Sequence, residues 1–417
     1  MEILAVIMAG GKGERLYSLT IDRTKPAVPF GGKYRIIDFV LSNVINSGIH
    51  SIYVLTQFKS QSLTEHLLEN WQMGTILADD FIIPVPAQMR TGDSWYRGTA
   101  DAVYQNEHLI KRHRPDLIAV FGADHVYKMD IREMAKYHRE KEAHVTVATF
   151  PMPKSEAYRF GVIQVDGDWR VTGFQEKPAE NPETIPGQPD KVLVSMGNYI
   201  FESKILLEVL KADAEESGSM HDFGRDILPA SFKKIRLYAY DFRRNKLPGM
   251  ASGEPNDYWR DIGTIESYWE SNMDLRSVLP TFNIYDRYWP IYAGRSFAPP
   301  AKFVHDAEDR KGQAINSVVS EGCIISGSKA IDSVLGPYVH LHSYSVVEQS
   351  VLLENVEVGR GARIRRAIID KHNVIPPDTQ IGYNEEDDRK RYFVSSSGIV
   401  VIPKASKYER SPYIPSS

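Results

Sequence analysis

The sequence has very little cysteine and no long apolar run. A single cysteine, Cys323, stands among 417 residues, which excludes an intramolecular disulfide and a cysteine-rich metal site. No apolar run approaches the roughly 20 residues that a membrane-spanning helix needs, and no signal-peptide pattern follows Met1. The net charge of −4 provides no bulk attraction to nucleic acid. We therefore expect a cytoplasmic protein with neither a membrane nor a nucleic acid as its partner.

Residues 1–280 alternate short apolar runs with helix-like segments. The runs read as buried strands at 52–55, 117–121 and 145–148, and helical spacing occupies 38–47, 60–71, 100–112 and 131–142. Such alternation favours an α/β fold with a mostly parallel sheet covered on both faces. Ligands of these sheets bind beyond the carboxyl ends of the strands.

A repeat dominates the last part of the chain. Residues 281–313 are rich in proline and show little periodicity, which indicates a connecting segment. From residue 314 onward, apolar triplets recur with spacings of 16, 17 and 17 residues, beginning at Ser317, Ser333, Ser350 and Ala367. Apolar steps about six residues apart, grouped in coils of three, predict a β-helix. A β-sandwich is the alternative, and we expect Cys323 to lie in the core of either structure.

A glycine-rich loop follows the first apolar run directly. Residues 3–8 lead into Ala9-Gly10-Gly11-Lys12-Gly13, where backbone amides can approach a phosphate chain with no side chain between them. Arg15 and Lys25 place two cations nearby. The loop matches neither G-x-x-x-x-G-K-[ST] nor G-x-G-x-x-G. A tight strand-to-helix turn beside two surface cations is therefore the alternative.

Two aspartates are candidate ligands for Mg²⁺, which prefers one or two carboxylates together with substrate phosphates. Asp124 follows the run 117–121, and Asp261 lies in the segment 259–264. A helix cap or a turn residue is the alternative for each. Lys177 could pair with a sugar phosphate or form a solvated surface pair, and Tyr96 could offer its ring and hydroxyl to a sugar.

Seven motifs, in order along the chain, resemble a single family. They occupy residues 10–16, 23–39, 95–102, 160–162, 176–178, 221–224 and 258–264. Together they resemble the bacterial glucose-1-phosphate adenylyltransferases, also called ADP-glucose pyrophosphorylases, over nearly the whole chain. The resemblance implies a Rossmann-like nucleotidyltransferase domain at 1–280, a connecting segment at 281–313, and a left-handed parallel β-helix with a C-terminal tail at 314–417.

The resemblance also implies a reaction and its residues. The phosphate of α-D-glucose 1-phosphate would attack the α-phosphorus of ATP in line, releasing pyrophosphate and giving ADP-glucose for glycogen synthesis. Mg²⁺, the implied cofactor, would be held by Asp124 and Asp261. These two aspartates are implied to be catalytic together with Arg15 and Lys25. ATP would contact Gly10, Gly11, Gly13, Arg15 and Gln88. Glucose 1-phosphate would contact Tyr96, Gly161, Glu176, Lys177, Ser195, Tyr199 and Asp222.

Regulation is a further implication of the resemblance. It implies a homotetramer controlled by small-molecule allosteric effectors, with Gln57 and Trp95 relaying activator binding to the active site. Two positions depart from the family pattern. Ala123 stands beside Asp124 where glycine is usual, and Asp22 stands where some relatives carry a basic residue for a phosphorylated activator. Part of an anion site, or a solvated basic edge, is expected at Arg363, Arg365 and Arg366.

Three other functions stay open on the sequence alone. A uridylyl- or thymidylyltransferase acting on the same sugar phosphate would differ in the pocket around Gln88. An acyltransferase would need a catalytic histidine in the repeat, where the candidates His340 and His342 read as turn residues. A non-catalytic regulatory subunit would typically lack the cations matched by Arg15 and Lys25 or the metal carboxylate, and this chain has them all.

Overall fold

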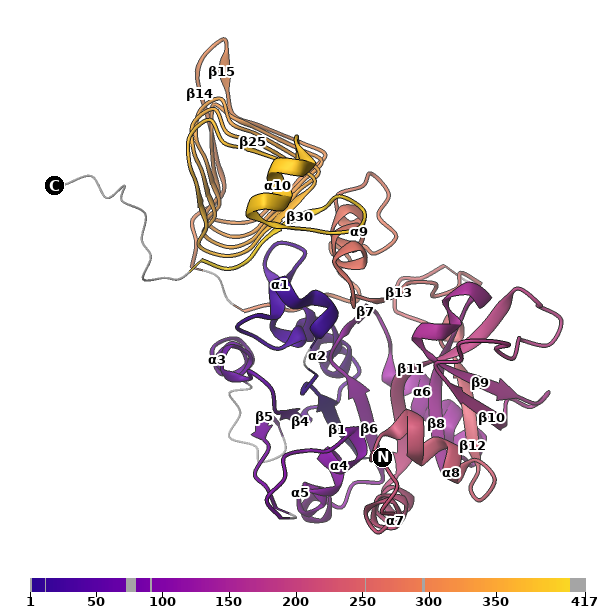
Figure 1. The fold of residues 1–417 in the computed structure, drawn as a ribbon. Coiled ribbons are helices and arrows are strands. Elements are labelled where there is room, and N and C mark those ends of the chain that lie inside the picture. Colours follow the sequence, from indigo (N-terminus) through magenta and orange to yellow (C-terminus); the bar gives the residue numbers. More distant parts are fainter. Residues whose placement is uncertain are drawn as a thin grey trace.

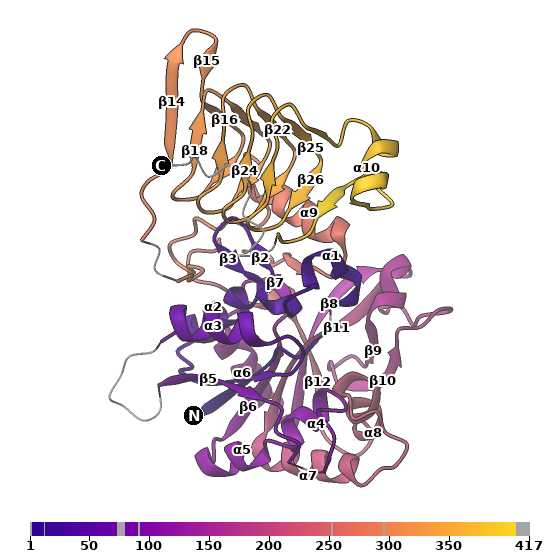
Figure 2. The same ribbon diagram turned by 60° about the vertical axis from the view of Figure 1, so that its left-hand side comes forward.

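The chain folds into two joined bodies, an α/β part and a prism of stacked coils (Figures 1 and 2). The computed structural model describes residues 2–11, 13–72, 80–90, 92–251, 253–294 and 297–405. None of the helices in these ranges is both long and apolar enough to cross a bilayer.

A nine-stranded sheet forms the centre of the α/β part. Its main order is β10-β9-β11-β6-β1-β4-β5, with β8 beside β11 and β12 beside β8. Four strands pair in parallel, which confirms the parallel sheet expected from the sequence. They are β1 (Ile3–Met8), β4 (Ser51–Thr56), β5 (Phe81–Pro86) and β6 (Leu117–Gly122).

The other side of the sheet contains antiparallel strands that the strand–helix alternation does not predict. β11 (Lys191–Glu202) runs antiparallel to β6, to β8 (Val145–Pro153) and to β9 (Gly161–Val165). β10 (Val171–Glu176) is antiparallel to β9, and β12 (Leu237–Asp241) is parallel to β8. Antiparallel neighbours need no crossover helix, so they leave no alternating pattern in the sequence.

Helices cover both faces of the sheet, as expected. Ala5 and Ile7 of β1 share one core with α2 (Ile36–Asn46), α3 (Gln61–Asn70) and α6 (Ile131–Glu140). Leu4 and Val6 share the opposite core with α4 (Thr99–Tyr104), α5 (Glu107–His113) and α7 (Ser203–Ala214). Alternate β1 residues therefore face opposite layers, because successive side chains of a strand point to opposite sides.

The helix expected over 100–112 is divided in two. α4 ends at Tyr104 and α5 begins at Glu107, with Asn106 between them. The Asn106 Nδ2 donates to the carbonyl of Ala102 (2.8 Å) and to the hydroxyl of Tyr96 (2.8 Å). An asparagine side chain that bonds nearby groups in this way competes with helix continuation. The Asn106 side chain at this break therefore holds the hydroxyl of Tyr96, a predicted site residue, by a hydrogen bond.

The shorter elements of the α/β part occupy its loops and its border with the prism. The short helices are α1 (Tyr17–Thr20) and α8 (Leu228–Ser231), and the longer helix α9 (Ile265–Leu275) follows β13. The short strands form two ribbons, β2 (Pro29–Phe30) with β3 (Tyr34–Arg35) and β7 (His125–Tyr127) with β13 (Trp259–Asp261). Single turns are η1 (Glu14–Leu16), η2 (Lys25–Ala27), η3 (Lys154–Arg159), η4 (Phe223–Ile227) and η5 (Phe242–Arg244).

Three parallel sheets wind into the prism, which has a triangular outline in Figure 1. The first contains β14 (Lys302–Ala307), β18 (Ile324–Ser326), β21 (His340–Leu341), β24 (Glu357–Val358) and β27 (Val374–Ile375). The second contains β16 (Gln313–Ile315), β19 (Lys329–Ile331), β22 (Val346–Glu348), β25 (Arg363–Arg365) and β28 (Gln380–Ile381). The third contains β17 (Val318–Val319), β20 (Val334–Leu335), β23 (Val351–Leu352), β26 (Ala367–Ile369) and β30 (Val400–Ile402).

This prism is the β-helix expected from the repeat. Cys323 lies fully buried in its core, as predicted. The first stacked strand, β14, begins at Lys302, inside the segment 281–313 that the sequence assigns to the connection, and it carries the small hairpin partner β15 (Arg310–Lys311). At the other end, α10 (Glu385–Arg391) and β29 (Phe393–Val394) close the last coil.

A buried ion pair joins the two bodies. The Arg23 guanidinium contacts the Asp370 carboxylate, and these side chains are 6% and 1% exposed. Arg23 lies between α1 and η2, close to Lys25, and Asp370 follows β26. Apolar residues of both bodies surround the pair in a common core, including Leu19 and Ile368. The β-helix therefore holds the segment that carries Lys25.

We expect Asp370→Asn to destabilise the protein strongly. The substitution leaves a buried guanidinium without its counter-charge, which costs about 3–5 kcal/mol. Thermal unfolding should show a markedly lower midpoint. The matched control is Glu385→Gln, which removes the exposed partner of Arg389 on α10 and should cost no more than about 1 kcal/mol. Equal midpoints for the two variants would contradict the role given to the buried pair.

Candidate active site

A cleft of about 760 Å³ opens at the carboxyl ends of the parallel strands. Met8, Leu55 and Gly122, at or near the ends of β1, β4 and β6, lie in its wall. This is the position expected for the ligand of such a sheet. The wall contains most of the residues predicted from the sequence, namely Gly10, Gly11, Gly13, Arg15, Lys25, Gln57, Tyr96, Asp124, Gly161, Glu176, Lys177, Ser195, Tyr199 and Asp222.

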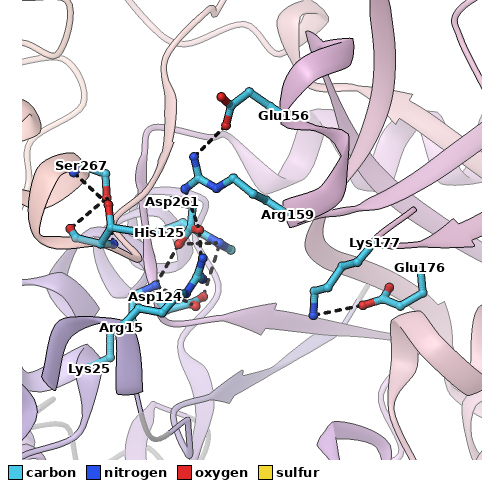
Figure 3. Close-up of polar contacts among 11 residues, drawn as sticks. Arg15, Lys25, Asp124, His125, Glu156, Arg159, Glu176, Lys177, Asp261 and Ser267 are labelled. Carbon is cyan, nitrogen blue, oxygen red and sulfur yellow. Dashed lines mark hydrogen bonds and ion pairs between the residues drawn. The ribbon is translucent and has the colours of Figure 1, made fainter. Parts of the chain in front are cut away.

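A cluster of charged side chains lies on one side of the cleft (Figure 3). The Lys25 Nζ is 3.1 Å from Asp124 Oδ2 and 2.9 Å from Asp261 Oδ1. Arg15 reaches the other oxygen of Asp261 at 3.6 Å. Asp261 enters the cluster because β13 pairs with β7, which places it opposite His125 in the register. Two aspartates far apart in the sequence thus meet around one ammonium group.

These contacts shift the pKa values of the cluster. Desolvation on its own would raise the pKa of Asp124, but electrostatic interactions with His125 and Lys25 outweigh it and lower that pKa. The pKa of Asp261 is lowered in the same way, against desolvation and the nearby Asp124 charge. Desolvation would lower the pKa of Lys25, but the two aspartates raise it. Both carboxylates and the ammonium are therefore charged at neutral pH.

The donor set around Asp124 and Asp261 is compatible with Mg²⁺. One ligand atom each from Asp124, His125 and Asp261 lies within 4.8 Å of the others. Carboxylate oxygens are the protein donors that Mg²⁺ prefers, with its remaining positions filled by phosphates and water. Ala123, which departs from the family pattern, is fully buried beside this group.

The opposite side of the cleft is built largely from the antiparallel strands and their loops. Asp222 accepts hydrogen bonds from the backbone amides of Gly224 (2.9 Å) and Arg225 (3.0 Å) and from the Thr99 hydroxyl (2.9 Å), so it caps η4. Lys177 Nζ lies 3.2 Å from Glu176 Oε1 at the end of β10. Lys177 and Glu176 are separated from the Lys25 cluster in Figure 3.

Gly98 brings two loops of this side together. Its neighbour Ala100 donates its amide to the carbonyl of His221 (2.8 Å). A Cβ at residue 98 would lie 2.2 Å from that same carbonyl oxygen and 2.3 Å from that of Met220. Only glycine permits this approach. The loop that carries Tyr96 is thereby joined to the loop that carries Asp222.

Three predicted site residues, Gln88, Trp95 and Asp261, are not in the wall of the cleft. Gln88, which follows β5, accepts hydrogen bonds from Arg90 at Nε (3.2 Å) and Nη2 (2.9 Å). Trp95 is 54% exposed and does not line the cleft, whereas its neighbour Tyr96 does. Asp261 also lies outside the lining set, but it contacts the cluster directly through Lys25 and Arg15.

Sequence reasoning missed Arg159 and His125. Arg159, at the end of η3, lines the cleft and lies 3.5 Å from Asp261 Oδ2 and 2.8 Å from Glu156 Oε2. Its only sequence signal is its place directly before the motif 160–162. His125 follows Asp124 and lies 3.4 Å from Asp124 Oδ1 and 3.8 Å from Asp261 Oδ1. Its sequence signal is its place directly after the candidate metal ligand Asp124.

Comparison with known proteins places both bodies in described families. A family model described as nucleotidyl transferase matches residues 4–278, and one described as GlmU-like, C-terminal hexapeptide matches residues 299–402. The chain is 54% identical to the glucose-1-phosphate adenylyltransferase of Deinococcus radiodurans, covering 96% of this chain and 98% of that protein. It is also 54% identical to that of Thermus thermophilus (98% and 99%) and 48% identical to glucose-1-phosphate adenylyltransferase 1 of Vibrio parahaemolyticus (97% and 98%).

We expect Gly98→Ala to destabilise the protein and to disturb the cleft. The added methyl group would collide with two backbone carbonyls that cannot move aside alone, and overpacking of this kind costs about 1–3 kcal/mol. Thermal unfolding should show a lower midpoint. Gly167→Ala is the control, because a Cβ there meets nothing within 4 Å. If both variants unfold at the same temperature as the parent protein, the close approach at Gly98 is not needed.

Proposed function

We propose that this chain, which belongs to the glucose-1-phosphate adenylyltransferases of the nucleotidyl transferase family, transfers the adenylyl group of ATP to α-D-glucose 1-phosphate. The products are ADP-glucose and pyrophosphate, and ADP-glucose supplies glycogen synthesis. The observation that carries the proposal is the convergence of Lys25, Asp124 and Asp261 in a cleft whose opposite side is polar. That arrangement suits a polyphosphate on one side and a sugar on the other.

The glycine loop supports the placement of the triphosphate. A Cβ at Gly11 would meet nothing within 4 Å, so its backbone faces open space that a phosphate can enter. Gly13 has a φ of +65°, and a Cβ there would lie 2.9 Å from the Lys25 Cβ. Glycine at residue 13 therefore lets the loop approach the lysine. We assign the triphosphate to Gly10, Gly11 and Gly13.

Charge stabilisation is the main catalytic contribution that these residues can make. The attacking sugar phosphate is already ionised, so the reaction needs no general base, and catalysis rests on positioning and on charge. Mg²⁺ held by Asp124 and Asp261 would neutralise phosphate charge. Lys25, whose pKa is raised by these two aspartates, carries a full positive charge. Arg15 adds a second cation for the α-phosphate and the leaving pyrophosphate.

Arg159 is a further cation that we assign to this reaction. Its guanidinium lies 3.5 Å from Asp261, on the side of the cluster opposite Arg15 and Lys25 in Figure 3. It comes from η3, next to the antiparallel strands, whereas Arg15 and Lys25 come from the N-terminal loops. The phosphates would thus be approached by positive charge from both sides of the cleft.

The sugar phosphate is assigned to the polar side of the cleft. Lys177 would hold its phosphate, and the sugar hydroxyls would contact Tyr96, Glu176, Ser195, Tyr199 and Asp222. Gly161 limits the available space, because a Cβ there would lie 2.5 Å from the ring of Phe174. A residue larger than glycine would force this ring, which also lines the cleft, to move. The roles of these residues extend the family resemblance to this cleft.

We also propose that the enzyme is a homotetramer under allosteric control. The Gln57 Nε2 donates a hydrogen bond to the backbone carbonyl of Tyr96 at 3.3 Å. A shift of Gln57 would therefore reach a residue of the proposed sugar site directly. Trp95 lies next to Tyr96 and is largely exposed, which suits a relay from the surface. Of the three arginines expected at an anion site or a basic edge, Arg363 and Arg365 share the ring of Tyr383, and Arg366 lies over Trp269.

Pyrophosphate release with each of the four nucleoside triphosphates, in the presence of glucose 1-phosphate and Mg²⁺, tests the proposed substrate. We expect ATP to be preferred. The base would be read near β5, where Gln88 is engaged by Arg90 and must turn to reach an adenine edge. Preference for UTP or dTTP would instead identify a uridylyl- or thymidylyltransferase. Lack of product with every triphosphate, even with candidate effectors present, would overturn the proposal.

We expect Asp124→Asn to lower turnover about a hundredfold or more without unfolding the protein. The substitution removes one of two carboxylates and so weakens the stabilisation of phosphate charge, for which losses of this size are typical. Turnover and the thermal midpoint should be measured together. Asp190→Asn, at an exposed carboxylate outside the cleft wall, is the control and should leave turnover unchanged. Full activity of Asp124→Asn would remove this residue from the proposed metal site.

A further inference from the structure

A second group of possible metal ligands lies on the β-helix. It consists of His340 and His342, at β21, and Glu357, on the next strand β24. His340 lies opposite Glu357 in the parallel register, and Leu341 and Val358, each adjacent in sequence to one of them, are fully buried in the prism. Because side chains alternate along a strand, the two histidines and the glutamate share the outer face. His340 is thus a strand residue, not the turn residue that the sequence suggests.

The three side chains are close together on this face. The rings of His340 and His342 have centroids 4.0 Å apart with an angle of 33° between their planes. His342 Nε2 lies 2.7 Å from Glu357 Oε1. One ligand atom from each residue lies within 4.8 Å of the other two. Two imidazoles and one carboxylate from adjacent coils therefore converge on one point.

We propose that His340, His342 and Glu357 bind a divalent transition-metal ion of the Zn²⁺ class. Two imidazole nitrogens and a carboxylate oxygen form a donor set typical of Zn²⁺, with a water molecule in the fourth position. Ligand atoms of a tetrahedral zinc site lie about 3.3 Å apart, given bonds of about 2.0–2.1 Å. Small rotations of these partly exposed side chains close the remaining gap.

The chemistry of this site differs from that of the cleft. Imidazole nitrogens favour zinc, cobalt and nickel, whereas carboxylates and phosphates favour magnesium. The β-helix site has two histidines and one carboxylate, and the cleft has two carboxylates and one histidine. A zinc ion at the β-helix would tie the coil of β21 to the coil of β24. It would stabilise the folded prism by binding only when the two coils are stacked.

Metal titration of the untagged full chain, after removal of divalent ions by a chelator, tests this proposal. We expect Co²⁺ to give the visible absorption bands of tetrahedral coordination, and Zn²⁺ to displace it and raise the thermal midpoint. His342→Ala should lose these bands, one Zn²⁺ per chain and the rise in midpoint. Glu357→Gln should weaken them while keeping a hydrogen bond to His342, which separates a metal ligand from a hydrogen-bonded pair.

Two controls locate the site. His305→Ala removes another histidine of the β-helix, on β14, and should retain the bands. Asp124→Asn disables the cleft and should also retain them. Retention in both controls together with loss in His342→Ala supports the proposal. Equal Zn²⁺ binding by the parent protein and His342→Ala, or loss of the bands in Asp124→Asn, overturns it. Turnover with Mg²⁺ should be the same in His342→Ala as in the parent protein, so this result is independent of the proposed reaction.

Discussion

The ammonium of Lys25 between Asp124 and Asp261 is the interaction on which the architecture of the cleft depends. Two carboxylates so close together repel each other unless a cation lies between them. Each partner comes from a different segment: Lys25 begins η2, Asp124 follows β6, and Asp261 ends β13 in its ribbon with β7. The fold must therefore hold three distant segments in register. The charged groups that hold these segments together are the ones that would bind a triphosphate and its metal ion.

The parallel and the antiparallel strands of the α/β part build different sides of the cleft. The parallel strands end together and present the glycine loop, Asp124 and Gln57 at one edge. The antiparallel strands and the loops joined at Gly98 present Tyr96, Asp222 and Lys177 from the other direction. A nucleotide and a sugar phosphate need different surroundings, one rich in backbone amides and cations, the other rich in polar side chains. The mixed sheet supplies both within one cleft.

The β-helix contacts the segment that carries the site residue Lys25. Arg23, close to Lys25 in the chain, is fixed by Asp370 in a buried contact between the two bodies. Apolar residues of both bodies share the surrounding core, so the contact excludes water and the ion pair is screened little. A movement of the coils would therefore displace the segment that carries Lys25. This contact is a physical route from the β-helix to the cleft for the proposed allosteric control.

The sequence by itself determined the parts of the molecule that leave a local or periodic pattern: the first strand with its glycine loop, the helices on both faces, the stacked coils, and the motifs that line the cleft. The tertiary structure alone decided which strands are antiparallel, the break at Asn106, the approach of Arg159 to Asp261, and the meeting of His340 and His342 with Glu357. The physical reason is that periodicity reports which side chains are buried, whereas these contacts depend on which distant strands become neighbours and in what register. The family resemblance likewise identifies Gln88 as a candidate, but only the fold shows that its amide oxygen accepts hydrogen bonds from Arg90 and that Gln88 is not in the wall of the cleft.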